Sequence, residues 1–278
     1  MQAKFFSIIV VALNPGDRLK ATLESIVSQT FSDYEVILKD GESLDGSLGE
    51  LEENGFLAEY SQIKVEKQKD GGIYDAMNQA VKLASGRFLL FLNCGDYLYS
   101  ENVLKEAAGE IQTAIEKGKN IGIYYGNLYN RAQKAFISSP PEINNFTCYR
   151  NVPCHQVCFY RRDLFGERAY RTEYRVRADY EHFLYCIYTK RVKALAIPVT
   201  VASYEGGGFS ETKENRKRSA REHREITLNY LGPAKVYRYR LLMLLTLAPL
   251  RTRLAENPAF SGVYNGIKKG IYGLLHRS

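Results

Sequence analysis

The chain has 278 residues, a hydrophobic content of 45% and a formal net charge of +7. The hydrophobic content supports a large folded core, and no apolar run reaches the ~18 residues that span a bilayer, so no membrane-spanning helix is predicted. The positive charge favours anionic partners, namely nucleotide phosphates, nucleic acid or an anionic membrane surface.

Strands and helices alternate through the first third of the chain. Apolar runs predict strands at residues 5–11, 34–39, 63–67 and 87–92, and helical periodicity predicts helices around residues 19–27 and 75–86. Alternation at this spacing predicts a parallel sheet with right-handed crossovers. Neither GxGxxG nor GxxxxGKS/T follows the first strand, which counts against a dehydrogenase or a kinase.

Three acids, Asp40, Asp70 and Asp96, follow the ends of these strands. Ligands of open α/β sheets bind outside the carboxyl ends of the strands, so Asp70 and Asp96 are expected to face one crevice and to hold a cation or a ribose. Asp40 either accepts hydrogen bonds from a base or ribose or forms a plain Asx turn, and spacing alone does not decide between them.

The sheet is expected to continue beyond this first part. A hairpin is predicted at residues 121–129 and 135–138, strands at residues 156–160 and 192–203, and an amphipathic helix at residues 175–190. A glycine loop at residues 205–211 precedes a basic stretch at residues 213–224. This stretch either closes over phosphates or forms a solvated helix face.

The last segment mixes basic and apolar residues. Lys235, Arg238 and Arg240 precede an apolar run at residues 241–245. This pattern suits a helix lying in a membrane interface, and the alternative is a helical tail packed on the catalytic domain. The predicted organisation is a domain at residues 1–231 and a basic amphipathic helical tail at residues 232–278.

Five ordered motifs within residues 5–210 carry a resemblance to a known family. They are Ser7-Ile8-Ile9-Val10, Leu23-Glu24-Ser25-Ile26 with Gln29, Asp40-Gly41 with Ser43 and Asp45-Gly46-Ser47, Asp70 with Gly72-Ile73-Tyr74-Asp75-Ala76-Met77-Asn78, and Phe91-Leu92-Asn93 with Gly95-Asp96. These motifs resemble those of the family 2 glycosyltransferases, which are inverting enzymes. The resemblance implies the GT-A fold, a Rossmann-like, mostly parallel sheet flanked by helices. The subgroup most similar to the chain makes bacterial exopolysaccharide, capsule and O-antigen.

The resemblance also implies roles for single residues. Asp40 and Asp70, with Asn14 and Asp45 nearby, correspond to the nucleotide-binding residues. Asp179 resembles the catalytic base, although Ala178 stands where a glutamate is frequent. Glu181 is the fallback base.

The stretch from Asn93 to Asp96 matches the metal-binding DxD position of the family. Asn93 replaces its first aspartate, which leaves Asp96 to hold Mn²⁺ or Mg²⁺ together with diphosphate oxygens and water. This departure makes the metal dependence an open question. His155 and Gln156 are further candidates for contact with the donor sugar or the diphosphate.

The implied function is transfer of a sugar from a nucleotide-diphosphate donor, UDP by default, to a hydroxyl of a lipid-linked or growing glycan in bacterial surface polysaccharide synthesis. The alternatives are a sugar-nucleotide pyrophosphorylase and a non-catalytic scaffold that binds nucleotide sugars or glycans. Nucleic acid is not expected, because carboxylates in the proposed cleft would repel its backbone. Five cysteines, an odd count, and no signal peptide predict reduced thiols in the cytosol. The basic amphipathic tail adds the expectation that the protein is peripheral at the inner face of the cell membrane.

Overall fold

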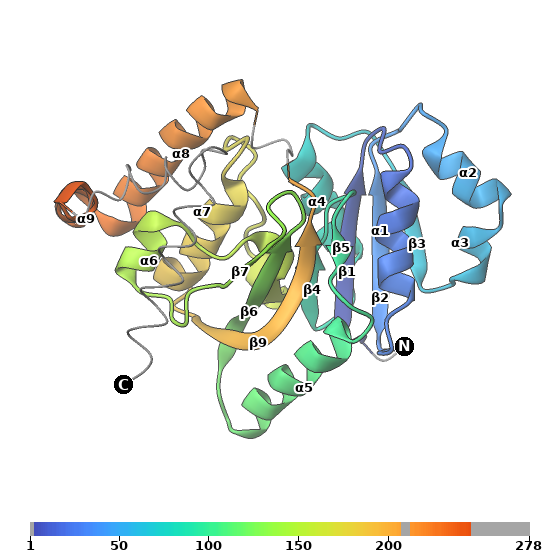
Figure 1. Cartoon of the computed structure of the whole chain (residues 1–278), viewed down its shortest axis with the longest axis horizontal. Helices are drawn as coiled ribbons and strands as arrows, with labels where there is room; N and C mark the ends of the chain where they lie inside the picture. Colours follow the sequence, from blue (N-terminus) through green and yellow to red (C-terminus); the bar gives the residue numbers. More distant parts are fainter. Residues whose placement is uncertain (1–2, 207–211, 246–278) are drawn as a thin grey trace. The chain divides into compact units, whose positions relative to one another are not determined.

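The computed structural model describes residues 3–206 and 212–245 (Figure 1). The chain divides into two compact units, residues 1–226 and residues 227–278. Among the described residues, no helix has the length and apolar character needed to cross a membrane. The boundary at residues 231/232 stays a prediction.

The first unit contains one nine-stranded sheet in the order β3-β2-β1-β4-β8-β6-β9-β5, with β7 paired to β6. The strands are β1 (Phe6–Ala12), β2 (Tyr34–Asp40), β3 (Ile63–Lys67), β4 (Phe88–Phe91), β5 (Tyr97–Leu98), β6 (Ile121–Asn130), β7 (Ala135–Ile137), β8 (Cys158–Arg161) and β9 (Lys193–Tyr204). The described helices of the chain are α1 (Arg18–Val27), α2 (Ser47–Glu53), α3 (Phe56–Glu59), α4 (Ile73–Leu83), α5 (Val103–Glu116), α6 (Asn145–Arg150), α7 (Ala178–Leu184), α8 (Lys213–Leu231) and α9 (Pro233–Leu245).

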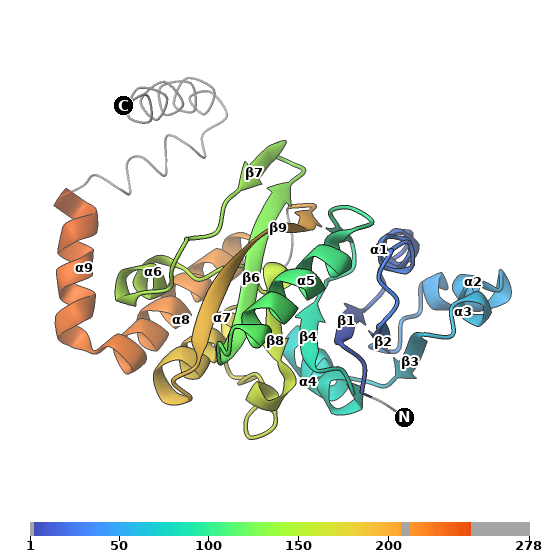
Figure 2. The same cartoon turned by 90° about the horizontal axis from the view of Figure 1, so that it is seen from below.

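The half of the sheet formed by β1 to β4 is parallel, as predicted. β1 pairs with β2 and β4, and β2 pairs with β3, all in parallel. Every residue of β1, β2 and β4 is buried. In Figure 2, α4 lies on the opposite side of the sheet from α1 and α5, which explains why both faces of these strands are apolar. This arrangement leaves the carboxyl ends of β1 and β2 free to carry a site.

The other half of the sheet differs from the expectation of a mostly parallel sheet. β8 runs antiparallel to both β4 and β6, β5 runs antiparallel to β9, and only β6 and β9 pair in parallel there. The hairpin of β6 and β7 is confirmed. The expected strand at residues 156–160 begins only at residue 158, as β8, and a 3₁₀ turn, His155–Val157, precedes it. Within this turn, the Gln156 side-chain amide donates a hydrogen bond to the carboxylate of Asp96.

The helix expected at residues 175–190 begins three residues later, at α7, and continues as a π-helical turn, Tyr185–Thr189. The basic stretch forms the first part of α8, where Lys213, Arg216 and Lys217 are exposed. That exposure favours a solvated helix face for these three side chains. Most of the preceding glycine loop, residues 207–211, lies outside the described residues.

A buried histidine in α7 makes the stability of the fold sensitive to pH. His182 is 0% exposed and stacks on Phe165 with ring centroids 4.1 Å apart, and neither ring nitrogen has a hydrogen-bond partner among the described residues. Burial lowers the pKa of His182 to about 3. The unfolded chain, with an ordinary histidine pKa near 6.5, therefore binds a proton that the folded chain does not, and stability falls as the pH drops below about 6.5.

We expect His182→Phe to remove this loss of stability. When the pH is lowered from 8 to 5, the unfolding free energy of the wild type should fall by about 2 kcal/mol more than that of the variant. Urea unfolding of both proteins at the two pH values measures the difference. His223, whose pKa burial also lowers to about 4, is present in both proteins and cancels. Equal pH slopes for the two proteins would refute the assignment.

Candidate active site

Two adjoining cavities of about 480 Å³ and 390 Å³ lie at the carboxyl end of β1 and the start of α4. Both are lined by Val11, Ala12, Leu13, Ile73 and Tyr74. Asp70 lines the larger cavity and Asp96 the smaller one. The two acids therefore line neighbouring cavities that share a wall. We name the larger one the first cavity and the smaller one the second cavity.

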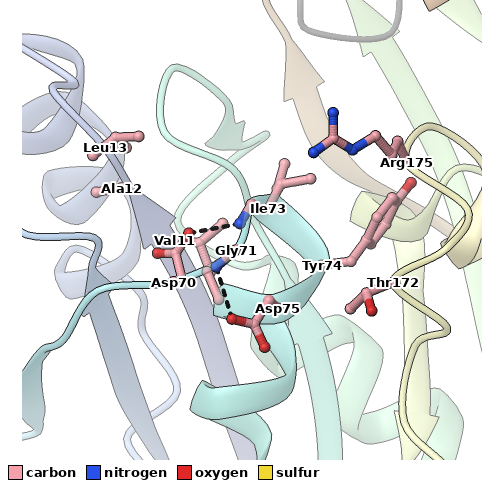
Figure 3. A pocket seen from close by; sticks show the side chains of 12 residues that line it. Val11, Ala12, Leu13, Asp70, Gly71, Ile73, Tyr74, Asp75, Thr172 and Arg175 are labelled. Carbon is pink, nitrogen blue, oxygen red and sulfur yellow. Dashed lines mark hydrogen bonds between the residues drawn. The ribbon is translucent and has the colours of Figure 1, made fainter.

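The first cavity surrounds the glycine turn that opens α4 (Figure 3). Asp70 Oδ1 accepts a hydrogen bond from the Gly72 N–H at 2.9 Å, and Asp75 Oδ2 accepts one from the Gly71 N–H at 2.8 Å. Gly72 has a φ of +126°, which side-chain-bearing residues rarely adopt, so this turn requires glycine. Arg175 stands on the opposite side, with its guanidinium directed over the cavity.

A fully buried lysine fixes Asp70 at the edge of this cavity. Lys39, on β2, is 0% exposed at its side chain, and its Nζ lies 3.4 Å from Asp70 Oδ2. The same ammonium donates to the backbone carbonyls of Asp40, at 2.9 Å, and Gln68. Buried charges require partners, so the pair is mutually stabilising in this position. Lys39 is not among the residues predicted for the site, although a lysine that ends a buried apolar run is an available signal.

Three residues predicted to bind the nucleotide tie neighbouring loops together. Asp40 accepts hydrogen bonds from the Ser43 N–H at 2.8 Å and from its hydroxyl at 2.5 Å. Asn14 Oδ1 accepts one from a backbone N–H of the loop after β2, at 2.8 Å, and Asp45 Oδ2 accepts one from the Gly16 N–H at 2.8 Å. Asn14 lines the second cavity, whereas Asp40 and Asp45 line neither of these two. Their contact with a nucleotide stays a prediction.

Asp96 is the buried carboxylate of the second cavity, with 4% of its surface exposed. Its Oδ1 accepts a hydrogen bond from the Glu205 backbone N–H at 2.9 Å, and its Oδ2 accepts one from the Gln156 side-chain amide. Burial raises the pKa of Asp96 to about 6 in spite of these hydrogen bonds. A strongly perturbed carboxyl group in a cavity is a candidate for function.

The second cavity offers oxygen atoms to a divalent cation. Asn93 also lines it, and Asn93 Oδ1 is buried without a hydrogen-bond partner among the described residues. Its amide nitrogen lies 3.3 Å from His155 Nε2. Mg²⁺ and Mn²⁺ favour oxygen ligands, so Asp96 and Asn93 fit such a cation. Among the described residues, no group of three or more His, Cys, Asp or Glu side chains could hold a metal ion. A cation at Asp96 and Asn93 would take its other ligands from substrate and water.

Asp179 is the second carboxylate of this cavity and lies at the start of α7. His155 Nδ1 lies 3.0 Å from its Oδ2, and the Tyr74 hydroxyl donates to its Oδ1 at 2.8 Å. Burial acts to raise the pKa of Asp179, but the contacts with His155 and Tyr74 outweigh it and hold the pKa below its usual value. Asp179 is thus ionised at neutral pH and able to accept a proton.

Glu181, the fallback base, lies elsewhere. Its side chain is 1% exposed, it lines neither of the two cavities, and it pairs with Arg168 at 2.9 Å. A carboxylate so enclosed does not reach a substrate in the second cavity. The structure therefore favours Asp179 over Glu181 as the base.

Two polar residues on one face of α4 organise the segment that leads to Asp179. The Tyr74 hydroxyl also donates to the Val176 carbonyl at 2.9 Å, and Asn78 exchanges two hydrogen bonds with the backbone of Tyr170, at 2.8 and 2.9 Å. Residues four apart lie on the same side of a helix. Tyr74 and Asn78 both belong to a motif of the resemblance, but no role was predicted for either; their spacing of four residues is the available signal.

Comparison with known proteins agrees with this geometry. The family model for Glycosyl transferase family 2 matches residues 7–168. A PGL/p-HBAD biosynthesis glycosyltransferase of Mycobacterium tuberculosis is 37% identical over 215 residues, which cover 76% of this chain and 81% of that protein. An Escherichia coli protein, UDP-Glc:alpha-D-GlcNAc-diphosphoundecaprenol beta-1,3-glucosyltransferase WfaP, is 30% identical over 195 residues, covering 68% of this chain and 72% of its own.

Solved structures share the fold. The crystal structure of Staphylococcus aureus TarS 1–349 in complex with UDP-GlcNAc superposes with a TM-score of 0.62 at 20% identity, covering 81% of this chain and 67% of that one. The mannosyltransferase PcManGT from Pyrobaculum calidifontis, in complex with GDP-Man and Mn²⁺, gives a TM-score of 0.60 at 14% identity, covering 95% of this chain and 84% of that one.

Proposed function

Because the chain belongs to glycosyl transferase family 2, we propose that it transfers one sugar from a nucleotide-diphosphate donor to an acceptor hydroxyl, with inversion at the anomeric carbon. The observation that carries the proposal is the second cavity. It brings Asp179, held ionised, and Asp96, buried with a raised pKa, to the walls of one space. Pairs of carboxyl groups with divergent pKa values are typical of sites with divided roles.

The family and the fold read from the motifs are both confirmed, and the chain is a glycosyltransferase with the GT-A fold. This disfavours a sugar-nucleotide pyrophosphorylase, whose glycine-rich loop with an arginine is missing after β1. A scaffold without turnover is also disfavoured, because Asp179 and Asp96, the carboxylates proposed here as base and cation ligand, both line the second cavity.

The proposed chemistry is a single displacement. The glycosyl–diphosphate bond breaks as the acceptor oxygen attacks from the opposite face, and Asp179 accepts the proton of that hydroxyl. His155 and Tyr74 hold Asp179 in its ionised form and fix its orientation. A divalent cation at Asp96 and Asn93, when bound, supplies neutralisation of the leaving diphosphate. No covalent nucleophile is required.

The relatives suggest the substrates. WfaP is named for UDP-Glc as donor and for an acceptor on diphosphoundecaprenol, and another relative, from Bacillus spizizenii, is named poly(ribitol-phosphate) beta-glucosyltransferase. We infer a UDP-sugar donor and a lipid-linked or growing glycan acceptor in bacterial surface polysaccharide synthesis. Nucleic acid is not proposed as a partner.

Release of free nucleotide from a panel of UDP-, GDP- and dTDP-sugars, with and without Mn²⁺, tests this function in the purified protein. Slow, metal-dependent release from one donor is expected, because water replaces the missing acceptor. Thermal stabilisation by a nucleotide without release from any donor, even with a glycan-diphosphate-lipid acceptor added, would favour the scaffold instead.

We also propose that the C-terminal segment binds the inner face of the cell membrane from the cytoplasm. In α9, Lys235, Arg238 and Arg240 are exposed, as are Tyr237 and four of the leucines. Basic residues beside exposed apolar side chains are typical of helices in a membrane interface. The rest of the expected tail, residues 246–278, lies outside the described residues.

Removal of residues 232–278 is therefore expected to abolish co-sedimentation with vesicles that contain anionic lipid. The full chain should sediment with these vesicles and lose binding at high salt, since the charged part of the attraction is screened. Vesicles of neutral lipid are the control. Sedimentation of the truncated protein at the level of the full chain would exclude the tail as the anchor.

A further inference from the structure

The segment that carries Asp179 is held in place by a carboxylate from a distant helix. Glu222, on α8, is 6% exposed. Its Oε1 accepts a hydrogen bond from the Arg175 N–H at 3.0 Å, and its Oε2 accepts bonds from the N–H groups of Val176, at 3.0 Å, and Arg177, at 2.9 Å. Three consecutive backbone donors thus converge on one side chain.

Other contacts between α8 and this segment make the attachment specific. Arg177 Nε donates to the Ser219 hydroxyl at 2.8 Å, and Ser219 lies three residues before Glu222, on the same face of the helix. His223 stacks on Tyr180 of α7, with ring centroids 5.1 Å apart and an interplanar angle of 24°. Figure 1 shows α8 running alongside α7.

The opposite side of the segment is held by α4. The carbonyl of Val176 accepts a hydrogen bond from the Tyr74 hydroxyl, which also binds Asp179. The N–H groups of residues 175–177 thus point to α8, and a carbonyl of the same residues points to α4. Hydrogen bonds to a charged acceptor are stronger than neutral ones, so Glu222 is the main support on its side.

We propose that Glu222 is a positioning residue for catalysis, through which α8 sets the place of Asp179 in the second cavity. This inference rests on the proposed role of Asp179 as the base. Only Ala178 lies between Asp179 and Arg177, the last residue whose N–H binds Glu222, so a shift of residues 175–177 moves the carboxylate directly. Displacements of about 1 Å at a reacting group can lower rates on the order of 10²-fold. The basic helix α8 is thereby part of the catalytic apparatus and not only a solvated surface.

Glu222→Gln tests the proposal. The amide keeps one acceptor oxygen but sets an N–H₂ group against backbone donors, so residues 175–177 are expected to shift. We expect the maximal rate of nucleotide release from the donor to fall 10- to 100-fold, as an order-of-magnitude value, with the Kd for donor nucleotide changed less than about twofold. Glu225→Gln is the matched control. It lies on the same helix and accepts one hydrogen bond, from the Tyr174 hydroxyl at 2.8 Å, which a glutamine oxygen preserves.

A double-mutant comparison separates positioning from a general loss of structure. Glu222→Gln is also made in a protein that already carries Asp179→Asn, where there is no base to position. There the further loss of rate is expected to be less than about twofold, since the effects of residues that act as a unit are not additive. Equal losses in both backgrounds would overturn the proposal, as would a wild-type rate in Glu222→Gln alone.

A wild-type rate in Asp179→Asn alone would contradict the proposed function, and it is measured separately from the effect of Glu222.

If Glu222→Gln does not fold, Glu222→Asp is used for the same comparison. It keeps the charge on a side chain one methylene shorter, and melting curves show which variants are folded.

Discussion

Asp179→Asn is expected to lower the rate of nucleotide release from the donor about 10²- to 10⁴-fold, which is the usual contribution of a positioned general base. The amide has nearly the shape of the carboxylate and can still accept the hydrogen bond from the Tyr74 hydroxyl. Donor affinity should therefore change little, and the loss should appear in the maximal rate. Single-turnover kinetics together with calorimetric titration of the nucleotide separate the two quantities.

A matched control for this variant is Glu173→Gln, an exposed carboxylate six residues earlier in the chain, which pairs with Arg171 at the surface. It should behave as the wild type. Asp179→Asn at the control rate would remove Asp179 as the base. A large rise in the Kd for donor, at an unchanged maximal rate, would instead make Asp179 a donor-binding residue.

The parallel half of the fold could be predicted because its signals are local. β1, β2 and β4 are short apolar runs buried on both faces, and the glycine turn before α4 is visible in the residues themselves. The motifs also placed Asp96 and Asp179, and the structure brings both into one cavity. What these residues do there remains a proposal that the variants test.

The remaining features depend on contacts between residues far apart in the chain. Tyr74 and the Val176 carbonyl are 102 positions apart, and Glu222 lies 46 positions after the N–H that it binds at Val176. Periodicity predicted a helix from residue 175, but the N–H groups of residues 175–177 bind Glu222 and the helix begins at residue 178. Likewise, the strand expected at residue 156 begins at residue 158, because Gln156 binds Asp96. In both places a hydrogen bond to a side chain far away in the sequence overrides the local pattern.

The second large effect is expected from Asp96→Asn, which should remove the response to Mn²⁺. Among the described residues that line the second cavity, Asp96 is the buried acid, and the neighbouring Asn93 offers only a neutral oxygen. Replacing the carboxylate by an amide leaves two neutral oxygens, which hold a divalent cation poorly. Nucleotide release should fall on the order of 10²-fold or more, because charge on the leaving diphosphate is no longer neutralised.

Calorimetric titration of UDP with and without Mn²⁺ gives a readout that does not depend on turnover. The wild type should bind UDP more tightly with the cation, whereas Asp96→Asn should bind it equally under both conditions. Glu205→Gln is the informative control, because it removes the third carboxylate that lines the second cavity, beside Asp96 and Asp179, but keeps the backbone N–H that binds Asp96. A Mn²⁺ response kept by Asp96→Asn and lost in Glu205→Gln would assign the cation to Glu205. A Mn²⁺ response lost in Asp96→Asn and kept in Glu205→Gln would assign the cation to Asp96. One aspartate would then bind the cation where the family pattern has two, with Asn93 and the substrate supplying further oxygen ligands.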